Sequence, residues 1–82
     1  MRIKVLYRNS LNLSPGKLAA QVAHAVVGLG ITDPLCTIVV LEASDAKYFY
    51  EINEHDCYEH IDLGYTEIPE GTSTCMAYIE LL

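Results

Sequence analysis

Residues 14–29 have the sequence SPGKLAAQVAHAVVGL and carry the start, period and stop signals of one helix. Ser14 offers a hydroxyl as N-cap, and Pro15 occupies the first helical position, where its missing N–H costs nothing. Gly28 and Gly30 end the pattern, because glycine is the usual residue just past a helix C-terminus. We therefore predict a helix that begins at Pro15 and stops at these two glycines.

Two stripes run along this predicted helix. The apolar stripe has helical spacing and is expected to face the core; it contains Leu18, Val22, Ala25 and Leu29, widened by Ala19, Ala23 and Val26. The second stripe repeats with the same spacing and places its members about one turn apart; it contains Lys17, Gln21, His24 and Gly28. Three polar side chains therefore line one face of the helix.

Apolar runs flank the helix on both sides. Residues 3–7 are apolar and partly β-branched, and a polar segment bounds them, which predicts a first strand. Residues 37–41, TIVVL, form a continuous run that is typical of a strand buried on both faces, so we expect it in the centre of a parallel sheet. Strand, helix and strand in this order form a βαβ unit.

Three more elements are predicted after this unit. Ser44 can cap a helix over residues 45–53, and residues 58–62 form a short strand that ends at Gly64. Residues 72–81 alternate with the period of a strand. The predicted α/β order is thus β-α-β-α-β-β, and 82 residues are expected to form a single domain, residues 1–82.

Composition and charge restrict the classes of function. With 51% hydrophobic and 20% charged residues, the chain has the composition of a folded protein. Its longest uncharged stretch, residues 18–32, is too short to span a bilayer, and its start lacks a secretory signal, so we expect a cytoplasmic protein without a membrane span. The three cysteines are an odd number without close pairing, which indicates reduced thiols. Five basic against eleven acidic residues give a net charge of −6, which repels phosphate.

The polar stripe allows a functional and a structural interpretation. A cation in the first turn of a helix opposes the macrodipole by about 0.3–1 kcal/mol, so Lys17 is an unusual placement. Lys17 is either a solvated lysine or, with the free N–H groups of the helix start, a binder of phosphate or of a developing oxyanion. Gln21 and His24 either donate hydrogen bonds to a substrate or pack and bond to the backbone.

A second polar group follows the short strand at residues 58–62. Asp62 and Thr66 lie on either side of Gly64, at a strand end where α/β proteins usually hold ligands. A carboxylate there can orient or deprotonate water, and a hydroxyl can steady the group under attack. The alternative is that Asp62 only forms a turn, since aspartate before glycine is a common turn former.

Metal and nucleotide cofactors are not expected. The spacing of the potential ligands between residues 55 and 62 is not that of a zinc site, and alternate strand residues point to opposite faces; these are His55, Asp56, Cys57, His60 and Asp62. The chain contains no GxxxxGK[ST], GxGxxG, CxxC or GxSxG motif, so neither a nucleotide cofactor nor a serine hydrolase is indicated.

Taken together, these segments resemble one known family. Residues 16–25, GKLAAQVAHA, resemble the helix signature of archaeal and eukaryotic-type peptidyl-tRNA hydrolases. Residues 62–74, DLGYTEIPEGTST, resemble the family's second signature, and residues 4–8, KVLYR, fit its first strand. The resemblance covers essentially the whole chain in the family's order. It implies a mixed four-stranded sheet with helices packed on its faces, and hydrolysis of the ester that joins a peptide to the 3′ end of tRNA, without a cofactor.

The resemblance also implies roles for individual residues. Asp62 is expected to position or activate water, and Lys17 to stabilise the oxyanion or hold a terminal phosphate. Thr66 and Thr74 are expected to fix the ester by hydrogen bonds. The remaining residues implied in binding peptidyl-tRNA are Gln21, His24 and Arg8. Replacing Lys17 or Asp62 by Ala is then expected to lower turnover by orders of magnitude and to leave folding intact.

Three features depart from the family and keep two other functions open. Ser10 stands where the family usually carries an aspartate, residues 28–36 are too short for a helix that the family has there, and few basic residues are available for tRNA. A divergent, non-catalytic member of the fold that binds a partner is one alternative. A homodimer that covers an apolar patch is the other. An open cleft shared by the Lys17 stripe and Asp62 favours the enzyme.

Overall fold

The protein is described by a computed structural model that covers residues 1–64 and 67–81. Its elements are β1 (Arg2–Arg8), a short 3-10 helix η1 (Asn9–Leu11), α1 (Pro15–Gly28), β2 (Thr37–Ala43), α2 (Asp45–Glu54), β3 (Tyr58–Ile61) and β4 (Ser73–Ile79). The predicted α/β fold is confirmed: a mixed four-stranded sheet with two α-helices, in the expected order of elements.

Both α-helices begin with the same local structure. The Ser14 hydroxyl accepts a hydrogen bond from the backbone N–H of Lys17 at 3.4 Å, and the Ser44 hydroxyl accepts one from Lys47 at 3.2 Å. Each serine thus satisfies one of the backbone donors that the first helical turn leaves free. Pro15 occupies the first position of α1, as the sequence predicts.

The order of the strands corrects one prediction. β1 is parallel to β2 and antiparallel to β4, and β4 is antiparallel to β3, which gives the order β2-β1-β4-β3. β2 is therefore an edge strand, and the prediction that residues 37–41 form a central strand is wrong. Ile38 and Val40 share the α1 face with Ile3 and Val5 and expose 44% and 41% of their surface, since α1 lies mainly over β1, β4 and β3. Leu41, on the α2 face, exposes 44%. The strand buried on both faces is β4.

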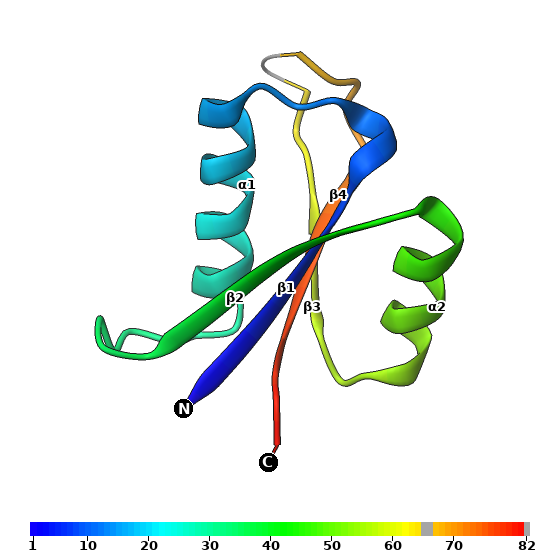
Figure 1. Ribbon diagram of the computed structural model, residues 1–82. Helices are drawn as coiled ribbons and strands as arrows, with labels where there is room; N and C mark the ends of the chain where they lie inside the picture. The colour runs from blue at the N-terminus through cyan, green and yellow to red at the C-terminus, as the bar shows by residue number, and fades with distance from the viewer. Residues whose placement is uncertain (65–66, 82) are drawn as a thin grey trace.

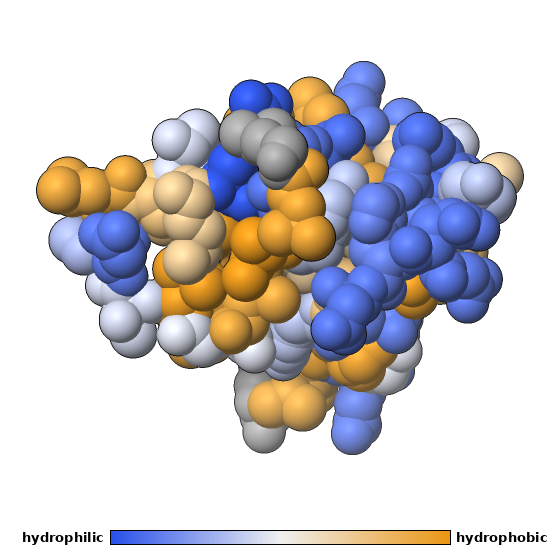
Figure 2. Space-filling model, turned by 90° about the horizontal axis from the view of Figure 1, so that it is seen from below, coloured by the Kyte–Doolittle hydropathy of each residue, from blue (hydrophilic) through white to orange (hydrophobic). Residues whose placement is uncertain are grey.

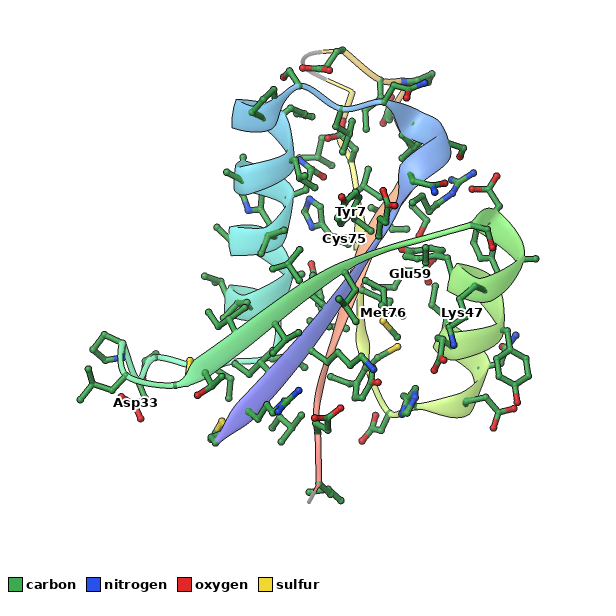
Figure 3. The ribbon with its side chains drawn as sticks, viewed as in Figure 1. Tyr7, Asp33, Lys47, Glu59, Cys75 and Met76 are labelled. Carbon is green, nitrogen blue, oxygen red and sulfur yellow. The ribbon has the colours of Figure 1, made fainter. Side chains whose placement is uncertain are left out.

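The two α-helices cover opposite faces of the sheet, as Figure 1 shows. Successive side chains of β4 alternate between these faces, and Figure 3 shows Cys75 directed toward α1 and Met76 toward α2. The core on the α1 side contains Ile3, Val5, Ala25, Cys75 and Ala77. The core on the α2 side contains Leu6, Ala43, Tyr48, Met76 and Tyr78.

Helix α1 buries part of both predicted stripes. Ala25 is fully buried, and Val22, Val26 and Leu29 pack around the core. Ala19 and Ala23 are exposed. Gln21 of the polar stripe is only 2% exposed. Gly28 lies against the ring of Tyr58, where a Cβ would come within 2.2–2.3 Å of ring atoms. The polar stripe of α1 therefore faces β3.

The surface is unevenly divided between apolar and polar residues. Figure 2 shows apolar residues gathered on one half of the face seen there, while the half that carries α2 is hydrophilic. Among the large apolar side chains, Met1, Leu35 and Leu81 are strongly exposed. Within the described residues, no helix has the length and apolar character needed to cross a membrane.

Candidate functional site

A pocket of about 440 Å³ lies between α1 and the end of β3. Its walls are formed on one side by Gly16, Lys17, Ala20, Gln21 and His24, and on the other by His60, Asp62 and Leu63. The polar stripe of α1 and the aspartate of the turn thus meet in one pocket.

The centre of the pocket is an ion pair between Lys17 and Asp62. The Nζ atom of Lys17 lies 2.7 Å from Oδ2 of Asp62, and the Lys17 side chain is 12% exposed. Asp62 is 3% exposed as a residue. The nearby carboxylate offsets the unfavourable interaction of a cation with the start of a helix. Lys17 is therefore a paired pocket residue and not a solvated lysine.

Asp62 also forms the turn that follows β3. Its Oδ1 atom accepts a hydrogen bond from the backbone N–H of Gly64 at 2.6 Å. Its own backbone N–H donates to the Thr72 carbonyl at 2.9 Å, and its carbonyl accepts from Gly71 at 2.8 Å. The hydrogen bond from Lys17 lowers the pKa of Asp62, against the effect of burial and with help from Gly64. The carboxylate is therefore ionised at neutral pH.

Gly64 and Glu67 fix the turn relative to α1. Gly64 has a φ of +83°, and a Cβ there would lie 2.7 Å from the backbone nitrogen of Glu70, so only glycine fits. The Glu67 carboxylate accepts hydrogen bonds from the Ser14 hydroxyl at 2.5 Å and from the Ser14 N–H at 3.1 Å. These bonds lower the pKa of Glu67 and join the turn to the first turn of α1, next to Lys17.

Thr74 lies behind the pocket wall. Its hydroxyl donates to Oε1 of Gln21 at 2.7 Å, and Thr74 is fully buried in β4. Thr74 is not among the described residues that line the pocket, whereas Gln21 is. The shortest hydrogen bond of Thr74 therefore holds the Gln21 amide at the pocket wall, and a longer contact of 3.4 Å joins its hydroxyl to the His60 carbonyl.

Two other predicted site residues lie elsewhere. The Arg8 guanidinium donates to the Asp45 carboxylate at 3.1 and 3.2 Å and to the Ser73 carbonyl at 3.0 Å. Ser10 donates to the same carboxylate at 2.7 Å. Arg8 thus links β1 to the start of α2, and the structure does not bring it to the pocket. Thr66 lies outside the described residues.

His60 lines the pocket, although in the sequence it stands out only as one of several potential metal ligands. Its ring stacks on that of His24, with centroids 4.8 Å apart and 10° between the planes. The Tyr58 ring lies 6.1 Å from the His60 ring, at 20°. In the described part of the chain, the buried Nδ1 atom of His60 has no hydrogen-bond partner. Burial lowers the pKa of His60, and the proximity of His24 adds to this effect.

The potential metal ligands between residues 55 and 62 are dispersed. His55 is bonded to Glu51 at 2.8 Å and stacks on Tyr78 on the α2 side, while His60 and Asp62 face the pocket on the α1 side. Within residues 1–64 and 67–81, no group of three or more His, Cys, Asp or Glu side chains is arranged to hold a metal ion.

The fold and the pocket together define a small α/β domain with a lysine and an aspartate paired in a pocket at the end of β3. No model of a known protein family matches the chain, and no curated protein matches it either.

Proposed function

We propose that this protein hydrolyses the ester bond between a peptide and the 3′ end of tRNA, as a cytoplasmic domain of the peptidyl-tRNA hydrolase type. The observation that supports this function best is the 2.7 Å contact between Lys17 and Asp62 inside the pocket. The two residues come from the two separate segments that resemble the family's signatures. No cofactor enters the proposal.

In this mechanism, the charge that develops on the ester carbonyl oxygen is stabilised by Lys17. Fixed donors act strongly on such an oxyanion when water is largely excluded, and the Lys17 side chain is mostly buried. Asp62 holds the ammonium group in place and positions the attacking water. Gln21, fixed by Thr74, and His24 bind the substrate at the pocket wall. Thr66 is proposed to contact the ester.

The acidic charge of the chain affects how the substrate is recognised. At a net charge of −6, the protein repels the phosphates of the tRNA body. Only five lysine and arginine residues are available, and each of them lies within 3.9 Å of a carboxylate. We therefore propose that recognition is concentrated on the ester and its immediate surroundings, with weak binding of the rest of the tRNA.

The test is release of labelled peptide from a model peptidyl-tRNA by the purified protein at moderate salt. The wild type is expected to release peptide, and Lys17→Ala and Asp62→Ala are expected to lose this activity. Circular dichroism at the assay temperature shows whether each protein is folded. A folded wild type without turnover would contradict the proposed function and favour a binding module that kept the fold.

A second candidate function is self-association through β2. In the part of the chain that the structure describes, β2 pairs only with β1, so its outer edge is open. The strand carries no lysine or proline, the residues that commonly protect such an edge. When two copies of β2 pair antiparallel about Val40, Glu42 lies opposite Ile38, so no like charges meet. One sheet would then continue across a homodimer.

Val40→Lys is expected to prevent this dimer, because it places a charge at the centre of the paired edges. Light scattering should then give a mass of 9.1 kDa for the variant and twice that mass for the wild type. Ala46→Lys, at an exposed position of α2, is the matched control and should remain dimeric. A wild type that stays monomeric at high concentration would exclude this second function.

A further inference from the structure

The proposed hydrolysis requires a group that takes a proton from the attacking water, and Asp62 is poorly suited to do so. Its Oδ2 atom is bound by Lys17 at 2.7 Å, and its Oδ1 atom by the Gly64 N–H at 2.6 Å. The same contacts lower the pKa of Asp62, which makes it a weaker base at neutral pH. Another group in the pocket must therefore accept the proton.

The described residues of the pocket wall include two imidazoles that can act as bases. Gln21 is an amide and is already bonded to Thr74, so it cannot take this role. His24 and His60 stack on each other across the pocket, one from α1 and one from β3. His24 is exposed, whereas His60 is partly enclosed and has a buried ring nitrogen without a partner. His60 is thus the more enclosed of the two imidazoles at the pocket wall.

Charged and titratable groups face His60 from every element around it. Lys17 and His24 lie on α1, Asp62 follows in the turn, and Cys75 is the partner of His60 on β4. Burial lowers the pKa of His60 most, and the nearby His24 and Lys17 lower it further, while Asp62 acts in the opposite direction. Burial raises the pKa of the Cys75 thiol to about 11, so this neighbour is uncharged. At pH 7 the imidazole is therefore neutral and able to accept a proton.

We propose that His60 is the general base of this site and takes a proton from the water that attacks the ester carbonyl carbon. As the new C–O bond forms, the proton moves to the imidazole, and the carbonyl oxygen becomes an oxyanion beside Lys17. The imidazolium then returns the proton to the ribose oxygen as the ester C–O bond breaks. The products are a free peptide carboxyl group and a 3′ hydroxyl, and His60 is neutral again. This role rests on the proposed function and leaves Asp62 as the partner that holds Lys17.

The test is the pH dependence of peptide release by the wild type and by two glutamine variants. The wild-type rate should rise with pH through a midpoint below the ordinary imidazole value of about 6.5. The part of the profile in which the rate rises with pH is its acid limb. His60→Gln should lower the rate about 100-fold and remove this acid limb. His24→Gln should keep the limb and move its midpoint to higher pH, because His24 is one of the groups that lower the pKa of His60. Added imidazole should restore part of the activity of His60→Ala and none to an Asp62→Ala variant.

Different results would overturn different conclusions. A wild type that is active while His60→Gln keeps both the rate and the acid limb would overturn the role of His60 and leave the proposed function standing. An acid limb that disappears in His24→Gln and persists in His60→Gln would do the same. A folded wild type without any release of peptide would overturn the proposed function and the role of His60 together.

Discussion

Lys17→Met should lower the rate of peptide release by about 10²–10³-fold, the loss expected when one donor to an oxyanion is removed. Methionine keeps the length and the apolar stem of the side chain but lacks the ammonium group. The Nζ atom that lies 2.7 Å from Asp62 is then missing where the oxyanion forms. Because this charge exists mainly in the transition state, kcat should fall far more than KM changes. Release of labelled peptide over a range of substrate concentrations measures both quantities.

Lys47→Met is the matched control for this experiment. Lys47 occupies the same position in α2 that Lys17 occupies in α1, three residues after a capping serine. The Lys47→Met substitution removes the same charge from the protein. Lys47, however, is exposed and is bonded to Glu51 at 2.8 Å, away from the pocket. Its variant should release peptide at the wild-type rate. Equal losses in both variants would show that net charge matters and that Lys17 has no special role.

The helices and the polar stripe of α1 could be predicted because they depend on local signals. Ser14 and Ser44 cap the helices where the sequence places them, and the repeat of Lys17, Gln21 and His24 brings these residues to one pocket. The contact between Lys17 and Asp62 could not be predicted from local signals. It depends on the packing of α1 against β3, which no local spacing determines, and only the resemblance indicated it.

The position of each strand in the sheet could not be read from its apolar pattern. Residues 37–41 are continuously apolar, yet β2 lies at the edge, since a run of apolar residues does not show which neighbours cover it. β4 is the opposite case, because it contains a polar residue and is nevertheless buried on both faces. Thr74 has a polar side chain, but its hydroxyl is paired with Gln21, so β4 can be buried on both faces.

The role proposed for His60 could not be predicted from the sequence either, because it depends on packing between distant segments. In the sequence, His60 stands among other potential metal ligands, and its neighbour in the pocket, His24, belongs to a distant helix. Stacking of the two rings and enclosure of the His60 nitrogen arise only when α1 lies over β3. Gly28 contributes to this packing, because the absence of a side chain leaves room for Tyr58.

Lys17→Met should also lower the free energy of unfolding at pH 7, by roughly 3–5 kcal/mol, as expected when one partner of a buried ion pair is removed. Asp62 is 3% exposed and would keep only its hydrogen bond from Gly64. The buried ion pair therefore leads us to expect a loss of stability in Lys17→Met, where the resemblance implies intact folding. Urea unfolding at pH 7 measures this loss, and an unchanged midpoint would contradict the buried pair.

The loss of stability caused by Lys17→Met should become smaller as the pH falls. The pKa of Asp62 is lowered in the folded protein, so the stabilisation from the ion pair is complete above the unfolded-state value of about 3.9. It is lost as the pH falls through the lower pKa of the folded state. The stabilities of the wild type and Lys17→Met should therefore converge below about pH 3.9, which urea unfolding between pH 7 and about pH 2 would show. A constant difference over this range would mean that Asp62 does not carry the effect.

The double variant Lys17→Met with Asp62→Asn separates stability from catalysis. Asparagine keeps the oxygen that accepts from Gly64 and removes the charge that Lys17→Met leaves uncompensated. Most of the lost stability should then return, since the cost of the single variant is an unpaired buried charge. Turnover should stay as low as in Lys17→Met, because the donor to the oxyanion is still missing. A double variant that regained activity along with stability would show that Lys17 acts on the fold alone.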